Sequence, residues 1–399
     1  MRLDYEISKY VFRSNVLGVV LSAVMSQRVI RSLLILLITS QIFSLIPIGE
    51  AQQLVNFTEF TIPTSGSGPH DAVADSKGRI WYTGQFSNKV GFVDPSTAQF
   101  TEFQVPTPNS GPHGLTVGPG DVPWFTGVSS DKIGRLNPTD GTITEYDVPT
   151  AKSGPHTLRF DSGGRLWFTE ETGNKVGYFD PSKESFVEFA VPTTQSTPYG
   201  LDINDRGDVW FAELSGSKIG VATQTSGVVS EFPIPTPGGG SRRVAIDKTG
   251  KVWFTEFFVS KLGVFDPTTR KFQEWETPTK NSGAYALVID KNGLVWFSEY
   301  NANKVGYLDP STTAIREFDI HTPHSNIRFM SLTPDGQVAY AASGSNVIGL
   351  ISLDQSNPAM RTSTGETGFL PAQTIITVSA TVATLVALLL IRKRRDGKK

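Results

Sequence analysis

The sequence predicts an all-β fold, a seven-bladed β-propeller built from repeats of 43 residues. Two series of residues in phase indicate the repeat. Tryptophans stand 43 residues apart, and one further step reaches Ala339 inside a matching string: Trp81, Trp124, Trp167, Trp210, Trp253 and Trp296. Glutamates keep the same spacing at Glu59, Glu102, Glu145, Glu188, Glu231, Glu274 and Glu317. Units of about 40 residues with four strands each are typical of propeller blades.

Each unit contains four short β-type runs separated by turn residues. In one unit these runs cover residues 156–161, 165–169, 175–180 and 186–191. Gly and Pro interrupt the body too often for a helical solenoid. The run from Asn56 to Ile62 matches a fourth strand, whereas the last unit ends near Asp354 after its third strand. We therefore expect a propeller over residues 54–354 whose N-terminal strand completes the last blade and hides its open edge.

The N-terminal segment has the features of a secretory signal. Arg28 and Arg31 precede an apolar run from residue 32 to 48, and Gly49 and Ala51 place small residues where a signal peptidase cleaves. Residues 1–51 are therefore interpreted as an N-terminal extension and signal peptide. An uncleaved N-terminal anchor is the alternative, and Met25 is a second candidate start.

The C-terminal segment predicts a membrane anchor. Residues 372–391 carry no charge, and at about 1.5 Å per residue they can cross a hydrocarbon core of roughly 30 Å. The basic residues 392–399 suit a cytoplasmic tail, and residues 355–371 suit a flexible stalk. We expect a single-pass protein of the cell membrane with its propeller on the extracytoplasmic side.

Composition narrows the function classes. A net charge of −2 offers no broad basic surface, so nucleic acid is not an expected partner. Zero cysteines exclude disulfides, Cys-ligated zinc and a thiol nucleophile. We expect a monomer whose core depends on packing alone.

Alignment of the units places seven side chains at the start of the innermost strands, where they should surround one mouth of the central channel. We call them the mouth ring: His70, His113, His156, Tyr199, Arg242, Tyr285 and Arg328. A second set stands three residues after each tryptophan position: Gly84, Gly127, Glu170, Glu213, Glu256, Glu299 and Ala342. Residues 156 and 170 are symmetric about a turn, so we expect them to lie opposite each other across an antiparallel pair.

The third unit offers the strongest candidate chemistry. His156 and, on the neighbouring blade, His113 are candidate catalytic residues, since imidazole can act as a general base near neutral pH. Glu170 and Glu213 are candidate ligands of Mg²⁺, or alternatively of Ca²⁺, because both ions prefer carboxylate oxygen. The remaining mouth-ring residues His70, Tyr199, Arg242, Tyr285 and Arg328 are candidate substrate-binding residues. The alternative is a repeat consensus in which the glutamates pair with repeated lysines such as Lys175 and Lys218.

The repeat resembles that of the virginiamycin B lyases, also called streptogramin lyases, over about residues 54–354. The resemblance rests on Ser153-Gly154-Pro155-His156, Leu166-Trp167-Phe168-Thr169-Glu170 and Asn174-Lys175-Val176-Gly177. It implies a seven-bladed propeller that opens a cyclic depsipeptide by Mg²⁺-assisted elimination with a histidine base. Active members carry the histidines and metal carboxylates in the last two units, with an acidic residue two before the catalytic histidine. Here Tyr285, Arg328 and Gly154 stand at these positions, and Glu213 would have to supply the missing ligand.

Three functions follow as hypotheses. The first is a metal-assisted carbon–oxygen lyase that acts on a small cyclic ester. The second is a non-catalytic surface binding or adhesion module, in which the channel mouth binds a peptide, glycan or small ligand. A lactonase-type hydrolase ranks last, because such sites favour Asp and Asn near the channel metal and neither type occurs at these positions.

Overall fold

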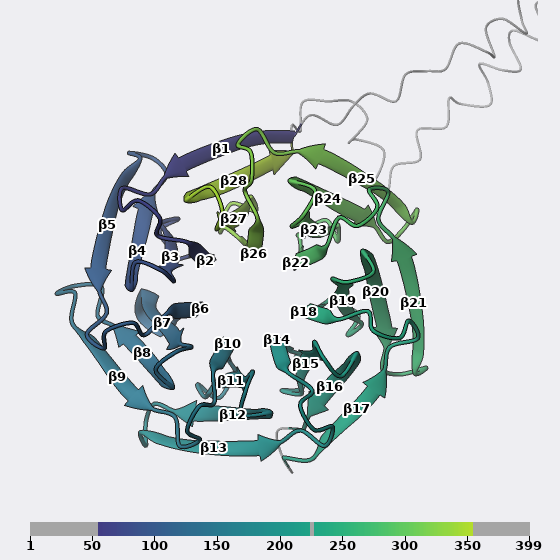
Figure 1. The fold of residues 1–399 in the computed structure, drawn as a ribbon, viewed down its shortest axis with the longest axis horizontal. Coiled ribbons are helices and arrows are strands. Elements are labelled where there is room, and N and C mark those ends of the chain that lie inside the picture. The colour runs from purple at the N-terminus through teal and green to yellow at the C-terminus, as the bar shows by residue number, and fades with distance from the viewer. Residues whose placement is uncertain (1–54, 224–226, 354–399) are drawn as a thin grey trace, which may run out of the picture. The chain divides into compact units, whose positions relative to one another are not determined.

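The computed structural model describes residues 55–223 and 227–353, and in them the chain forms the expected seven-bladed propeller. Seven four-stranded antiparallel sheets surround one axis, each with its first strand innermost (Figure 1). Within these residues no helix is long and apolar enough to cross a membrane. The predicted signal, stalk, membrane span and basic tail lie outside the described residues.

The first four blades follow one pattern, from the innermost to the outermost strand. Blade 1 consists of β2 (Pro69–Ala74), β3 (Ile80–Gly84), β4 (Lys89–Asp94) and β5 (Gln99–Gln104). Blade 2 consists of β6 (Pro112–Gly118), β7 (Val122–Gly127), β8 (Lys132–Leu136) and β9 (Ile143–Asp147), with a 3₁₀ turn η1 (Pro119–Asp121). Blade 3 consists of β10 (Pro155–Phe160), β11 (Leu166–Glu170), β12 (Lys175–Asp180) and β13 (Ser185–Ala190). Blade 4 consists of β14 (Pro198–Ile203), β15 (Val209–Glu213), β16 (Lys218–Ala222) and β17 (Val229–Pro233).

The remaining blades complete the ring, and the last one joins the two ends of the propeller. Blade 5 consists of β18 (Ser241–Ile246), β19 (Val252–Glu256), β20 (Lys261–Asp266) and β21 (Lys271–Glu276). Blade 6 consists of β22 (Ala284–Ile289), β23 (Val295–Glu299), β24 (Lys304–Asp309) and β25 (Ala314–Asp319). Blade 7 consists of β26 (Ile327–Leu332), β27 (Val338–Ala342), β28 (Val347–Leu353) and β1 (Val55–Thr61). The antiparallel pairing of β1 with β28 confirms the predicted closure.

The core lies between the blades. The second strand of every blade is buried, apart from Val122 at the start of β7, because its two faces pack against different neighbouring blades. In blade 3, Trp167 packs with Leu201 and Phe211 of blade 4, whereas Phe168 packs with Trp124 of blade 2. The tryptophan series is therefore structural, as its regularity indicates.

A turn between the first two strands fixes the tryptophan of blades 1, 3, 5 and 6 through an aspartate. In blade 3, Asp161 accepts hydrogen bonds from the backbone N–H groups of Gly163 and Arg165, both at 2.9 Å. Its second oxygen accepts bonds from Arg165 Nε at 2.8 Å and Trp167 Nε1 at 2.9 Å. Gly164 has φ +81°, a conformation that favours glycine. In blade 4, Asn204 takes the equivalent place, and the buried Trp210 Nε1 has no partner.

We predict that Asp161→Asn lowers the free energy of unfolding by about 1–3 kcal/mol, the usual cost of an unpaired buried polar group. The amide would turn an N–H donor toward the Trp167 and Arg165 donors. Urea denaturation followed by tryptophan fluorescence measures the change. The matched double variant Asn204→Asp/Asp208→Arg rebuilds the blade 3 turn in blade 4 and should raise the urea midpoint. Unchanged midpoints in both proteins would contradict this account.

Candidate functional site

A β-bulge at the start of each innermost strand determines which side chains reach the channel. In blade 3, Pro155 pairs with Glu170 and Leu158 pairs with Phe168, so β10 has one extra residue between these pairs. The other six innermost strands have a register shift at the same place. The expectation that His156 lies opposite Glu170 was therefore wrong, since Pro155 takes that place. Because of the bulge, two consecutive residues of each strand turn toward the axis.

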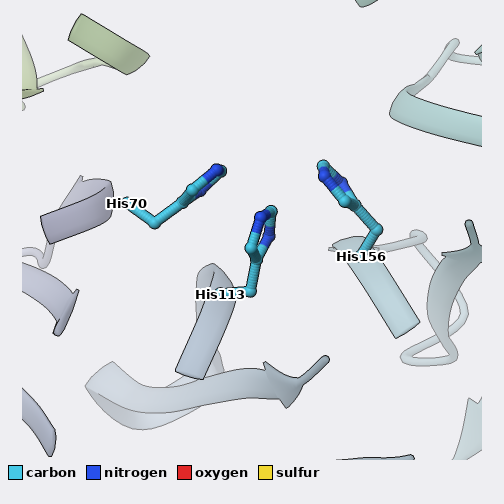
Figure 2. Close-up of side chains that lie close together, drawn as sticks. All are labelled: His70, His113 and His156. Carbon is cyan, nitrogen blue, oxygen red and sulfur yellow. The ribbon is translucent and has the colours of Figure 1, made fainter. Parts of the chain in front are cut away.

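Three mouth-ring residues from neighbouring blades form a histidine cluster, which we define as His70, His113 and His156. Figure 2 shows the three rings side by side, and their candidate ligand nitrogens all lie within 4.8 Å of one another. Ring centroids are 3.4 Å apart for His70 and His113, and 4.0 Å apart for His113 and His156. All three are buried.

Hydrogen bonds hold two of these rings by the same nitrogen. His70 Nδ1 lies 2.8 Å from Asp71 Oδ1, and His156 Nδ1 lies 3.0 Å from Thr157 Oγ1. The Nε2 atoms of His70 and His156 are buried and have no partner. Burial lowers the pKa of all three histidines well below its usual value, and Arg243 lowers it further. The neighbouring imidazoles also lower the pKa of His113 and of His156. The cluster is therefore uncharged at neutral pH.

The opposite side of the mouth ring joins two phenols and a guanidinium. The Tyr199 and Tyr285 hydroxyls are 2.8 Å apart, and Arg242 Nη1 donates to Tyr199 Oη at 2.8 Å. The Arg242 guanidinium also lies over the Phe257 ring, 4.3 Å from its centroid. The Tyr199 ring is 3.7 Å from the His156 ring, so it connects the two halves of the site.

The last mouth-ring residue, Arg328, contacts a further set of residues around the opening. Its Nη1 donates to Gln85 Oε1 at 3.2 Å, and its guanidinium lies 5.9 Å from the Tyr300 ring. Among the described residues, neither Arg242 nor Arg328 has a carboxylate within ion-pair distance. The mouth therefore presents two guanidinium groups that can bind an anionic or carbonyl oxygen.

The residues that directly follow mouth-ring residues form a second layer of contacts across the channel. Arg243 Nη1 donates to Thr157 Oγ1 at 3.0 Å, and its Nη2 lies 3.3 Å from Asp71 Oδ1. Arg243 and Asp71 are both buried. Burial raises the pKa of Asp71, although Arg243 opposes this effect. Gly200 fits here because any Cβ would lie 2.7 Å from the carbonyl oxygen of Arg242.

The glutamates predicted to bind metal lie in a different environment. Glu170 pairs across β11 and β12 with Lys175, and its oxygens are buried without a hydrogen-bond partner. Lys175 Nζ donates to Glu188 Oε2 at 2.7 Å, and Thr150 Oγ1 donates to the same oxygen at 2.8 Å. Glu213 has the same surroundings one blade later. Lys175 and Lys218 therefore pair with Glu188 and Glu231, and not with Glu170 and Glu213 as the alternative interpretation expected.

These surroundings favour the protonated form of Glu170 and Glu213 when no ion is bound. Burial, and then the neighbouring Glu188 or Glu231, raises the pKa of Glu170 and of Glu213 to about 8, so both are protonated at neutral pH. Mg²⁺ requires ionised carboxylates and retained waters in octahedral geometry. Among the described residues, the metal-ligand types gather in the histidine cluster, which contains neither glutamate. The involvement of Mg²⁺ or Ca²⁺ stays a prediction, and we assign it no ligand.

The alignment found every mouth-ring residue but missed their partners. The missed partners directly follow a mouth-ring residue in the sequence: Asp71, Thr157 and Arg243. In a regular strand, consecutive side chains point to opposite faces, so these residues would be expected to point away from the axis. Gln85, Phe257 and Tyr300 occupy one repeat position, four after the tryptophan series. Inspection of that variable position would have found them.

We predict that Glu170→Gln makes the fold less sensitive to alkaline pH. A carboxyl whose pKa is higher in the folded than in the unfolded state favours folding when protonated. The contribution of the Glu170 carboxyl group to the free energy of unfolding is complete below pH 4.5, the usual pKa of a glutamate. It is lost as the pH rises through about 8. Urea midpoints across this range should fall less in the variant than in the wild type. Asp205→Asn, at an exposed turn, is the control, and parallel curves for Glu170→Gln and wild type would disprove the assignment.

Comparisons with known proteins agree with this fold. The crystal structure of virginiamycin B lyase from Staphylococcus aureus matches with a TM-score of 0.71 and 28% identity, covering 75% of this chain and 100% of that one. A streptogramin B lyase structure matches with a TM-score of 0.71 and 29% identity, covering 75% and 98%. A catalytically inactive variant of the Staphylococcus aureus enzyme with quinupristin matches with a TM-score of 0.71, 28% identity and coverage of 75% and 100%.

No curated protein sequence matches the chain. The model of the Virginiamycin B lyase family matches residues 44–270, more than half of the 399 residues. The family match and the solved structures agree with the repeat, the blade number and the closure described above. This chain belongs to the virginiamycin B lyase family.

Proposed function

We propose that the channel mouth binds a small cyclic ester or depsipeptide and opens it by carbon–oxygen elimination, with His156 as the general base. The observation that carries this proposal is the state of His156: a buried imidazole with a lowered pKa and an unpartnered Nε2. We assign its Nδ1 proton to the hydrogen bond with Thr157 Oγ1, so that Nε2 carries the lone pair. An uncharged imidazole of this kind can accept a proton at neutral pH.

The groups beside His156 suit the charge that such a reaction creates. His156 Nε2 would take the proton α to a carbonyl, and the C–H electron pair would delocalise onto the carbonyl oxygen as an enolate. Collapse of the enolate then forms the Cα=Cβ double bond as the bond from Cβ to the ester oxygen breaks, and the electrons of that bond leave with the carboxylate. Arg242 Nη1 and the Tyr199 hydroxyl, linked at 2.8 Å, are donors for the enolate oxygen, and Arg328 is available for the leaving carboxylate.

His113 and His70 support this arrangement. His113 packs against the His156 ring and limits its rotation. His70 stands beyond His113 and is fixed by Asp71. We assign both residues to positioning, and Tyr285 to holding the Tyr199 hydroxyl.

We also propose that the propeller works outside the cell membrane, held by residues 372–391. The support is the charge-free apolar run of these residues and the basic tail that follows it. A surface location would suit the second hypothesis as well, in which the same mouth binds a ligand without changing it.

We predict that the full-length protein converts a cyclic depsipeptide such as quinupristin to a linear product of unchanged mass. Elimination adds no water, whereas a hydrolase would add one, so mass spectrometry separates the two reactions. His156→Ala should lower kcat/KM by about 10²–10⁴-fold, the usual contribution of a general base. His321→Ala, at an exposed position outside the mouth ring, is the matched control.

The other outcomes decide between the hypotheses. Binding without conversion, weakened by Arg242→Met, would favour a non-catalytic module over the lyase. Conversion that survives in His156→Ala would remove His156 from the mechanism.

A further inference from the structure

We propose that the histidine cluster is a binding site for a transition-metal ion of the Zn²⁺ class. The inference goes beyond the proposed function and does not rest on it. It begins from position: His70, His113 and His156 come from the equivalent place in β2, β6 and β10, so one repeat geometry brings them together three times. Their candidate ligand nitrogens lie within 4.8 Å of one another, and Figure 2 shows the three side chains close together.

The hydrogen bonds of His70 and His156 are those of metal-binding histidines, whereas the buried Nδ1 of His113 has no partner. Such a histidine usually gives its second ring nitrogen to a carboxylate or another oxygen, which fixes the ring and leaves the first nitrogen for the ion. Asp71 has this role for His70, and Thr157 has it for His156. Asp71 is itself held by the backbone N–H of Leu115 at 3.1 Å. The unused Nε2 atoms of His70 and His156 are buried and have no hydrogen-bond partner.

The ligand type indicates the class of ion. Imidazole suits zinc, copper, iron and nickel, whereas Mg²⁺ and Ca²⁺ prefer oxygen. Three histidines with an open fourth position are a known arrangement for zinc, with metal–nitrogen distances of about 2.0–2.1 Å. Tetrahedral ligands at that distance stand about 3.4 Å apart, so the three nitrogens, now within 4.8 Å, would have to move closer together to bind an ion.

The charge near the cluster is mixed, because Arg243 and Arg328 oppose a cation there whereas Asp71 favours one. The imidazoles are uncharged, and the Asp71 carboxyl group is the nearest acidic group bonded to the cluster. Arg243 opposes a cation, but it is drawn toward Asp71 and Thr157. Arg242 and Arg328 lie on the other side of the channel, where they would favour an anion on the open coordination position.

The two roles of His156 exclude each other, because its Nε2 cannot hold an ion and accept a proton together. A bound ion would therefore inhibit the proposed elimination. Metal binding itself is measured without any substrate, so failure of the lyase proposal and failure of this one are distinguishable.

The experiment uses the full-length protein, purified without a histidine tag. The chain has five histidines and no cysteine, so the imidazole ligands can be tested completely. We expect one Co²⁺ per chain, with the visible absorption bands of a tetrahedral site, and displacement by Zn²⁺. His70→Ala and His113→Ala should abolish these bands, whereas the double variant His321→Ala/His324→Ala should keep them.

Two further variants keep the test decisive. Asp71→Asn retains all three ligands and should weaken Zn²⁺ binding by about 10–100-fold, as loss of a carboxylate partner usually does. His113→Gln fills the same space if the alanine variants fail to fold, and circular dichroism checks each protein. Absence of binding in the wild type would overturn the proposal. So would bands that survive in the cluster variants or disappear in the double variant.

Discussion

Every blade depends on burying both faces of its second strand against its neighbours. In β11 alternate side chains enter two different hydrophobic clusters, with Trp167 on one side and Phe168 on the other. No blade can satisfy this condition alone, and the last blade satisfies it only when β1 joins β28. Closure is therefore a requirement of the packing, and it explains why a fold without a single cysteine needs no covalent link between its ends.

The same repetition leaves the channel free to vary. The bulge recurs at the start of every innermost strand, and the mouth-ring residues beside it belong to none of the hydrophobic core clusters. Substitution there changes the chemistry of the channel without loss of the blade interfaces. In this chain imidazoles occupy blades 1, 2 and 3, whereas the guanidiniums of the mouth ring occupy blades 5 and 7. The channel therefore has an imidazole side and a guanidinium side within one regular propeller.

Most of the fold could be predicted from the sequence, because the repeat samples each strand several times. The strands of blade 3 begin and end within one residue of the expected positions, and the mouth-ring residues line the axis as expected. The register of His156 and Glu170 could not be predicted, because a bulge changes strand pairing without changing the period of the repeat. The environment of Glu170 could not be predicted either. Its neighbours Lys175 and Glu188 stand at two other positions of the repeat, and an alignment of the repeats does not show which positions come together in space.

The electrostatic state of the site follows from the ring as a whole. His156 alone, in water, would titrate near neutral pH. In the structure, burial lowers the pKa of His156 most, and His113 and Arg243 lower it further. Residues around the channel therefore affect one another's protonation. For Glu170, burial and then Glu188 of the same blade raise the pKa and so favour the neutral form of the carboxyl group. Chemistry in such a channel therefore cannot be assigned residue by residue from a family pattern. The same histidine has different properties according to which side chains occupy the equivalent positions of the other blades.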